Sequence, residues 1–178
     1  MSENTEYFKR AKELLSYNSE TGLFTWISRS KNSNIMIGAI AGNSSHGRIR
    51  IGITIQGKQK HLQGNILAWY FYYGKLPEEN FVIDHIDGDG MNNKISNLRK
   101  CTKKQNSYNR KLNKNNKTGF KGVYKRGNKF LATINHNQKP REIGRFSCPK
   151  EAAKAYDKEA IKCFGEYAKL NFKRENYV

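Results

Sequence analysis

The sequence is poor in acidic residues, cysteine, proline and long apolar runs. Its 178 residues include 15 Asp and Glu against 33 Lys and Arg, with three Cys and three Pro. No apolar run approaches the roughly 20 residues that cross a bilayer, and no apolar core follows a basic start, so neither a membrane span nor a signal peptide is predicted. Three widely spaced cysteines argue against a disulfide framework or zinc knuckle and favour a reduced intracellular setting.

The excess of positive charge is concentrated in one stretch. Between Arg99 and Arg145 there are 15 basic residues and a single acidic one, Glu142. This segment therefore supplies +14 of the formal net charge of +18. A cationic field of this size attracts polyanions, whereas a merely solubilising surface would mix the two signs. The clustering therefore predicts a nucleic acid as the partner. Neither a membrane nor an obligate protein partner is indicated.

The first part of the chain predicts a mixture of helix and strand. Isoleucines alternate with polar residues over 48–55, which is typical of a strand with one apolar face. Aromatic residues crowd the segment before Gly74 and Pro77, which favours a buried helix. The predicted elements are a helix over 4–16, strands over 23–27, 48–55 and 59–62, and a helix over 66–73.

The stretch VIDHIDGDGMNNKISNLRKCTKKQN, residues 82–106, gathers histidine, aspartate and asparagine between two short apolar anchors. An apolar strand leads into Asp84-His85, and two glycines then permit a tight loop. The run TKKQ at 102–105 fits a capping box, which puts Asn106 near the start of a helix. The predicted order is therefore strand, loop, strand and helix.

This layout resembles the ββα-metal active site of the HNH nucleases, in the variant that ends in Asn and has Asp before the His. Asn97 follows His85 by twelve residues, and Asn106 follows Asn97 by nine. Upstream, YNSETGLFTW, IGAIAGN and HGRIRIGITIQGKQ resemble the N-terminal parts of phage HNH homing endonucleases. One departure is Asn65-Ile66, where such proteins often have His-Arg, so a DNA contact there is not carried over.

The resemblance implies metal-dependent hydrolysis of DNA. It assigns His85 as the general base, Asp84 and Asn106 as ligands of one divalent cation per site, Mg²⁺ or Mn²⁺, and Asn97 as the residue that orients His85 and braces the loop. The residue types suit this chemistry, because an imidazole can take up a proton near neutral pH and carboxylate and amide oxygens are hard ligands. Four other polar residues of the loop are interpreted mainly as turn formers: Asp87, Asp89, Asn92 and Asn93.

The last 60 residues predict a separate unit. Strands are expected over 122–126, 129–137 and 141–147, followed by a helix that begins at Pro149 and stops at Gly165. GFKGVYKRGNKFLATI, IGRF, PKEAAKAYDKEA and FGEYAKLNF resemble the AP2 DNA-binding domain. Such domains lay a three-stranded sheet in the major groove, which admits a β-ribbon.

Alternation along the second of these strands separates two faces of the predicted sheet. Phe130, Ala132 and Ile134 would face the helix, and Phe146 should join them. Family members often have Arg or Glu where this chain has Tyr124, Thr133 and Asn135, so no target sequence is carried over. A merely solvated polar face is the alternative. The DNA-contacting residues that the resemblance implies are Tyr124, Lys125, Arg126, Lys129, Thr133, Asn135, Arg141 and Arg145.

An α+β protein in four parts is therefore predicted. The function expected is a homing-type endonuclease that cuts a recognised site in double-stranded DNA, in the cytoplasm of a bacterium or phage-infected cell. A DNA-binding regulator with an inactive HNH module, or a general basic protein that coats nucleic acid, are the alternatives. The parts are an N-terminal region that supports the nuclease and is a candidate for DNA contact (1–62), an HNH module (63–110), a basic linker (111–118) and an AP2-like domain (119–178).

Overall fold

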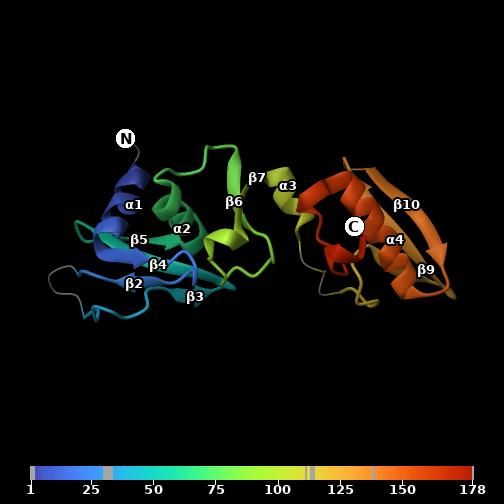
Figure 1. Cartoon of the computed structure of the whole chain (residues 1–178), viewed down its shortest axis with the longest axis horizontal. Helices are drawn as coiled ribbons and strands as arrows, with labels where there is room; N and C mark the ends of the chain where they lie inside the picture. The colour runs from blue at the N-terminus through green and yellow to red at the C-terminus, as the bar shows by residue number, and fades with distance from the viewer. Residues whose placement is uncertain (1–2, 30–33, 111, 113–114, 138, 178) are drawn as a thin grey trace. The chain divides into compact units, whose positions relative to one another are not determined.

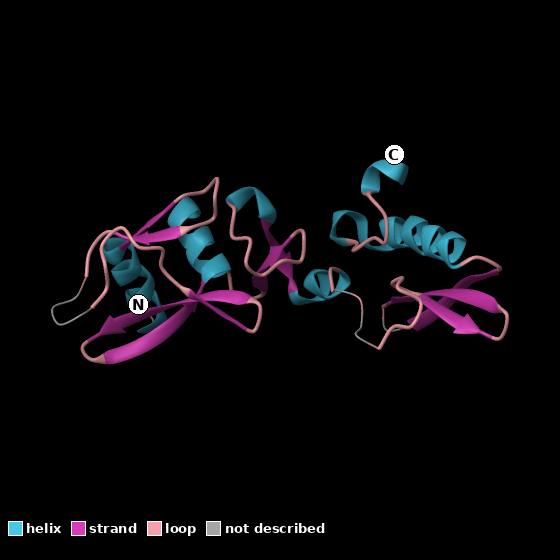
Figure 2. Ribbon diagram, turned by 90° about the horizontal axis from the view of Figure 1, so that it is seen from below, coloured by secondary structure: helices cyan, strands magenta, loops and turns pink. Residues whose placement is uncertain are grey.

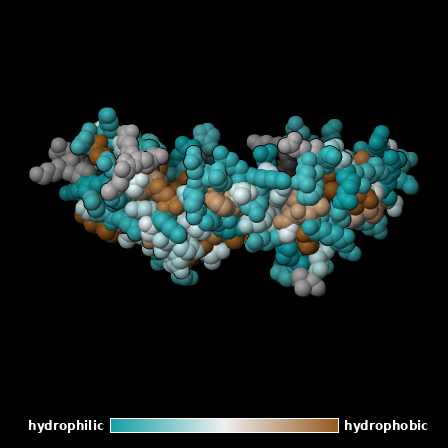
Figure 3. Space-filling model, turned by 90° about the horizontal axis from the view of Figure 1, so that it is seen from above, coloured by the Kyte–Doolittle hydropathy of each residue, from teal (hydrophilic) through white to brown (hydrophobic). Residues whose placement is uncertain are grey.

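The structure is a computed structural model that describes residues 3–29, 34–110, 112, 115–137 and 139–177. The chain divides into two compact units, Met1–Lys103 and Lys104–Val178 (Figure 1). No helix among the described residues is long and apolar enough to cross a membrane. Hydrophilic side chains cover most of the face drawn in Figure 3.

The first unit contains three small antiparallel sheets, ordered β1-β2, β3-β4-β5 and β6-β7. Its elements are α1 (Glu3–Leu14), β1 (Leu15–Tyr17), β2 (Phe24–Trp26), β3 (Asn43–Ser45), β4 (Arg48–Ile55), β5 (Lys58–Gln63), α2 (Gly64–Tyr73), β6 (Phe81–His85), the 3-10 helix η1 (Ile95–Asn97) and β7 (Leu98–Thr102). The first helix is shorter than predicted, because Leu15 leaves it to pair with Trp26.

One hydrophobic core holds this unit together. Ile51 and Ile53 of β4 are fully buried, as their alternation predicts, and they share the core with Leu67 of α2. Ile83 and Leu98, from the two strands of the predicted nuclease hairpin, belong to the same core. The boundary expected between residues 62 and 63 is therefore absent, since the N-terminal region and the hairpin bury their apolar faces against each other.

The second unit is a three-stranded sheet, ordered β10-β9-β8, with a helix along one face (Figure 2). Its elements are α3 (Lys103–Tyr108), whose first residue is the last of the first unit, β8 (Val123–Arg126), β9 (Lys129–His136), β10 (Lys139–Phe146), α4 (Pro149–Phe164) and the 3-10 helices η2 (Gly165–Tyr167) and η3 (Arg174–Tyr177). Pro149 begins α4 and Gly165 caps it, as predicted.

The apolar face of this sheet is the predicted one. Ala132 and Ile134 of β9 are buried under α4 in two adjoining clusters, and Phe130 and Phe146 pack against the cluster that contains Ala132. The fully buried Asp157 of α4 accepts hydrogen bonds from the backbone and side-chain nitrogens of Asn171 and from nearby groups. The closing segment of the chain is thereby tied to the helix.

The segment between the two predicted domains is folded onto the second unit where the structure describes it. Asn116 Nδ2 donates to the carbonyl of Phe120 at 2.9 Å, and the Thr118 hydroxyl donates to that of Val123 at 2.9 Å. Residues 111, 113 and 114 of the predicted linker lie outside the described residues. The unit boundary falls between residues 103 and 104, so the predicted 63–110 module spans both units.

Candidate active site

The β6-β7 hairpin brings a buried ion pair to the end of β6. Its register sets Asp84 opposite Arg99 and His85 opposite Leu98, and directly opposed residues project from the same face of an antiparallel pair. Arg99 donates from Nε and Nη2 to Oδ2 of Asp84, at 3.1 and 3.0 Å. Asp84 is only 7% exposed, and a buried carboxylate requires such a partner. Sequence reasoning did not single out Arg99, because its partner is fixed by strand register.

Asn97 ties together the two ends of the loop that follows β6. Its Nδ2 donates to Asp87 Oδ1 at 3.0 Å and to the Asn92 carbonyl at 2.8 Å, and its Oδ1 accepts from the Asp87 amide at 3.1 Å. Burial raises the pKa of Asp87, but hydrogen bonds from the Asp89 amide, Asn92 and Asn97 outweigh it and hold that pKa below its ordinary value. The loop is thus a compact hydrogen-bonded turn.

The His85 ring contacts the Asn93 side chain. His85 Nε2 lies 3.1 Å from Asn93 Oδ1, and the two residues are 5% and 1% exposed. The side-chain hydrogen bonds of Asn97 described above go to the loop itself, and its role in orienting His85 remains a prediction. The interpretation of Asn93 as a turn former was incomplete. Asn92 and Asn93 are equivalent in the sequence pattern, and only the tertiary fold buries the second.

Asn106 lies in α3, the helix predicted to follow the second strand of the hairpin. It is half-buried and belongs to the second unit, whereas Asp84 and His85 belong to the first. Its pairing with Asp84 at one cation remains a prediction. Among the described residues, no group of three or more His, Cys, Asp and Glu side chains is arranged to hold a metal ion. One carboxylate and one amide nevertheless suit Mg²⁺, which usually keeps several waters and takes the remaining ligands from phosphates.

The register of the C-terminal sheet sorts the predicted DNA-contacting residues into two faces. A bulge between Glu142 and Gly144 shifts the register of β10, so Arg141 pairs with Ile134 on the helix side, where it forms an ion pair with Glu159 of α4. Lys125 is likewise opposite Phe130. These two residues therefore do not belong to the outer face. That face carries Tyr124, Arg126, Lys129, Thr133, Asn135 and Arg145.

A cationic cleft of about 1020 Å³ lies within the second unit, bordered by α3 and β9. Lys121 lines it and donates from Nζ to the carbonyls of Tyr108 and Arg110, at 2.7 and 3.0 Å. Burial, with repulsion from Lys169, lowers the pKa of Lys121 to about 8. The Tyr108 ring stacks on Phe164 with centroids 4.1 Å apart. These contacts fix the C-terminal end of α3 to the second unit.

Comparison with known proteins identifies the central segment. Residues 65–108 match the HNH endonuclease family, and this range includes Asp84, His85, Asn97 and Asn106. The chain is 38% identical over 98 residues to an uncharacterised HNH endonuclease of Acanthamoeba polyphaga mimivirus, covering 55% of this chain and 50% of that protein. It is 38% identical over 65 residues to protein 3.8 of Escherichia phage T7, covering 36% and 50%. The chain thus spans about half the length of these relatives.

This chain is also similar to a solved structure that describes DNA binding and cleavage by the HNH homing endonuclease I-HmuI. The two sequences are 21% identical, the TM-score is 0.41, and the match covers 84% of each chain. The prediction of an HNH endonuclease domain is confirmed by the family match.

Proposed function

We propose that this protein is a metal-dependent DNA endonuclease of the homing type. Its HNH domain hydrolyses a phosphodiester, and its C-terminal domain, which resembles the AP2 domain, holds the DNA. The observation that carries the proposal is the buried Asp84-His85 pair at the end of β6, inside the segment that matches the HNH family. Viral and phage relatives fit a protein that acts in an infected cell.

His85 is the general base in this proposal. It accepts a proton from a water molecule, whose oxygen then attacks the phosphorus atom. Asp84 and Asn106 would hold the cation. A bound cation would neutralise the charge that develops on the departing oxygen. Arg99 orients the Asp84 carboxylate through its two hydrogen bonds. Asn97 keeps the loop after β6 closed through its hydrogen bonds to Asp87 and Asn92.

The outer face of the C-terminal sheet is the proposed DNA-docking surface. Arg126 and Lys129 lie opposite each other on it and are exposed, so they can contact phosphates. Arg145 donates to Glu142 at 3.0 Å, a solvent-exposed ion pair that a phosphate can replace at little cost. Tyr124 is 57% exposed and offers a ring that can lie against the DNA.

A second polar sheet face adjoins the proposed active site and is a candidate for further DNA contact. Arg48 and Arg50 of β4 are exposed, and His61 of β5 projects on the same side. No acidic residue occurs between Glu20 and Glu78 in the sequence. A Cβ added to Gly90, in the loop after His85, would lie 2.8 Å from Arg48 Cγ, so this sheet and the loop are in close contact.

Selection of cleaved DNA from a random library, with and without Mg²⁺ or Mn²⁺, tests the proposal. Both strands of the selected products are mapped, which also distinguishes a nick from a double-strand break. We expect cleavage that depends on the cation and occurs at a preferred sequence. Specific binding without any cleavage would instead indicate a regulator, and binding that disappears uniformly as salt rises would indicate a general nucleic-acid-coating protein.

A further inference from the structure

Asn93 occupies a position that turn formation does not explain. Its neighbour Asn92 makes the local loop contacts, donating from Nδ2 to Asp87 Oδ2 at 2.8 Å and accepting the Lys94 amide at 3.4 Å. Asn93 instead points inward, with Oδ1 on His85 Nε2. Its Nδ2 is buried without a hydrogen-bond partner among the described residues. Leaving such a donor unsatisfied costs about 1–3 kcal/mol, and such groups call for a functional explanation.

The N-terminal hairpin holds Asn93 in this position. The hydroxyl of Tyr17 in β1 donates to the Asn93 carbonyl at 2.7 Å. Burial, with the nearby charge of Glu20, raises the pKa of Tyr17 to about 12, so the hydroxyl remains a donor. The Tyr17 ring is in turn packed against Phe24 and Phe71, with centroids 4.8 and 6.2 Å away.

Two glycines allow the close approach that this arrangement needs. A Cβ at Gly22, in the turn between β1 and β2, would lie 2.6 Å from the carbonyl carbon of Asn93, and Gly22 also has φ +75. A Cβ at Gly64, the first residue of α2, would lie 2.8 Å from Asn93 Nδ2. Asn93 is therefore enclosed by segments that are distant in the sequence, and its amide has little freedom to move.

The contact with Asn93 has a direct consequence for the chemistry of His85. An amide oxygen can only accept a hydrogen bond, so a neutral His85 that contacts it must carry its proton on Nε2. Nδ1 is then the basic ring nitrogen. We propose that Asn93 is a positioning residue that holds His85 in the Nε2–H tautomer, and that the β1-β2 hairpin is a built-in support of the nuclease site through Tyr17 and Gly22.

The role in cleavage rests on the proposed function. In that reaction, water gives its proton to Nδ1, its oxygen bonds to phosphorus, and the bond to the departing oxygen breaks. The proton stays on Nε2, which donates it in a hydrogen bond to the Asn93 amide oxygen throughout. This bond keeps the ring oriented and stabilises the imidazolium that forms. The tautomer itself is a property of the folded protein and can be measured without any cleavage.

Nitrogen NMR of the full chain without metal, labelled at histidine, tests the tautomer directly. The spectrum is recorded where the His85 ring is neutral, and its signal is identified by its loss in His85→Gln. We expect Nε2 protonated in the wild type, a mixture of both tautomers in Asn93→Leu, and Nε2 again protonated in Asn93→Asp, which keeps an acceptor oxygen. Asn80→Leu, at an exposed position before β6, is the matched control and leaves the pattern unchanged. An Nδ1-protonated His85 in the wild type, or no change in Asn93→Leu, overturns the proposal.

Plasmid-cleavage kinetics test the consequence for the reaction. We expect Asn93→Leu to lower kcat by about 100-fold or more, the scale of lost general-base catalysis, with KM for DNA unchanged. Tyr17→Phe keeps the ring packing and removes one hydrogen bond, so kcat should fall roughly two- to tenfold; it also keeps the proposal testable if Asn93→Leu does not fold. A wild type that cuts no DNA but gives the expected NMR pattern contradicts the nuclease proposal alone. Normal kcat in both variants contradicts the positioning role.

Discussion

The two units treat their functional residues in opposite ways. In the first unit, Asp84, His85 and Asn93 are buried and each has a hydrogen-bonded neighbour. In the second, the proposed DNA-contacting residues stand on an open sheet face, and Arg126 and Lys129 are exposed. A reaction needs groups held in one geometry, and burial supplies that. Docking on a polyanion needs accessible charge, which burial would neutralise.

Their cores differ in the same sense. The core of the first unit contains large side chains from α1, β4, α2 and the β6-β7 hairpin. The strands that carry the site residues are therefore packed against several other elements. The core of the second unit is small and contains several alanines, among them Ala132, Ala152 and Ala160. This core packs one three-stranded sheet against one helix. Substitutions of the site residues should therefore affect folding and chemistry together in the first unit, whereas substitutions on the outer sheet face should affect binding alone in the second.

Among the variants predicted here, Arg99→Met should have the largest effect, because it removes the buried ion pair of the first unit. It leaves the Asp84 carboxylate buried without its cation, which should lower the free energy of unfolding by about 3–5 kcal/mol. Urea denaturation measures the loss. Lys100→Met, which removes the neighbouring cation and its exposed pair with Glu78, is the control and should leave the midpoint nearly unchanged. Adding Asp84→Asn to Arg99→Met should restore part of the stability; no recovery would mean that the ion pair is not the cause.

Removing positive charge from the outer face of the β10-β9-β8 sheet tests whether its exposed residues bind DNA. The double variant Arg126→Gln, Arg145→Gln removes two outer-face cations, so the slope of log K against log salt should fall by about 2. Lys125→Gln, Arg141→Gln removes the same charge from the helix side and should change the slope much less. Fluorescence anisotropy with a DNA duplex at several salt concentrations gives both slopes. Equal losses would mean that the sheet face makes no direct contact.

Lys121 should give the second unit a distinctive pH dependence. Its pKa of about 8 in the folded protein lies below that of an unfolded lysine, so the unfolded chain binds more protons between pH 8 and 10. Stability therefore rises with pH across that window. Thermal unfolding followed through amide signals of β9 should register a modest increase in midpoint, and Lys121→Met should abolish it. A midpoint equally pH-dependent in that variant would assign the effect to other groups.

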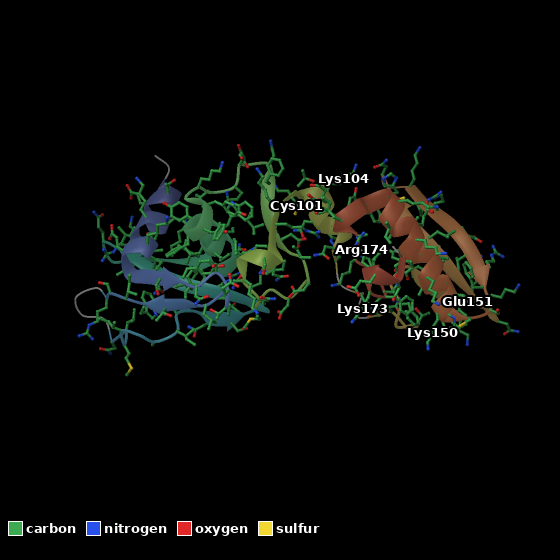
Figure 4. All side chains as sticks on the ribbon, viewed as in Figure 1. Cys101, Lys104, Lys150, Glu151, Lys173 and Arg174 are labelled. Carbon is green, nitrogen blue, oxygen red and sulfur yellow. The ribbon has the colours of Figure 1, made fainter. Side chains whose placement is uncertain are left out.

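The smallest expected effect concerns the reactivity of the Cys101 thiol, which is buried in β7 of the β6-β7 hairpin (Figure 4). Burial, with the nearby charge of Asp84, raises the pKa of its thiol to about 11, so little thiolate forms near neutral pH. Cys148 and Cys163 are half-buried. A chromogenic disulfide reagent should therefore titrate two thiols in the native protein and the third only after unfolding. Cys101→Ala should give two thiols in both states; rapid reaction of all three in the native wild type would mean that the hairpin opens readily.

Local patterns in the sequence predicted most of the fold. The isoleucine alternation of β4, the Pro149 start and Gly165 stop of α4, and the order of strand, loop, strand and helix around His85 depend on neighbours within a few residues. The relations that sequence reasoning missed depend on contacts between distant segments. The bulge after Glu142 turned Arg141 to the helix side, and strand register paired Arg99 with Asp84. Packing of the β1-β2 hairpin put Asn93 on His85.

His85→Ala provides the most direct test of the central claim that the first unit cleaves and the second holds the DNA. Cleavage and binding are measured with the same duplex, at the same salt and with the same divalent cation. The account predicts a loss of cleavage of at least about 100-fold, the lower end for a lost general base, with Kd for the duplex unchanged. Cleavage at the wild-type rate by His85→Ala would contradict it.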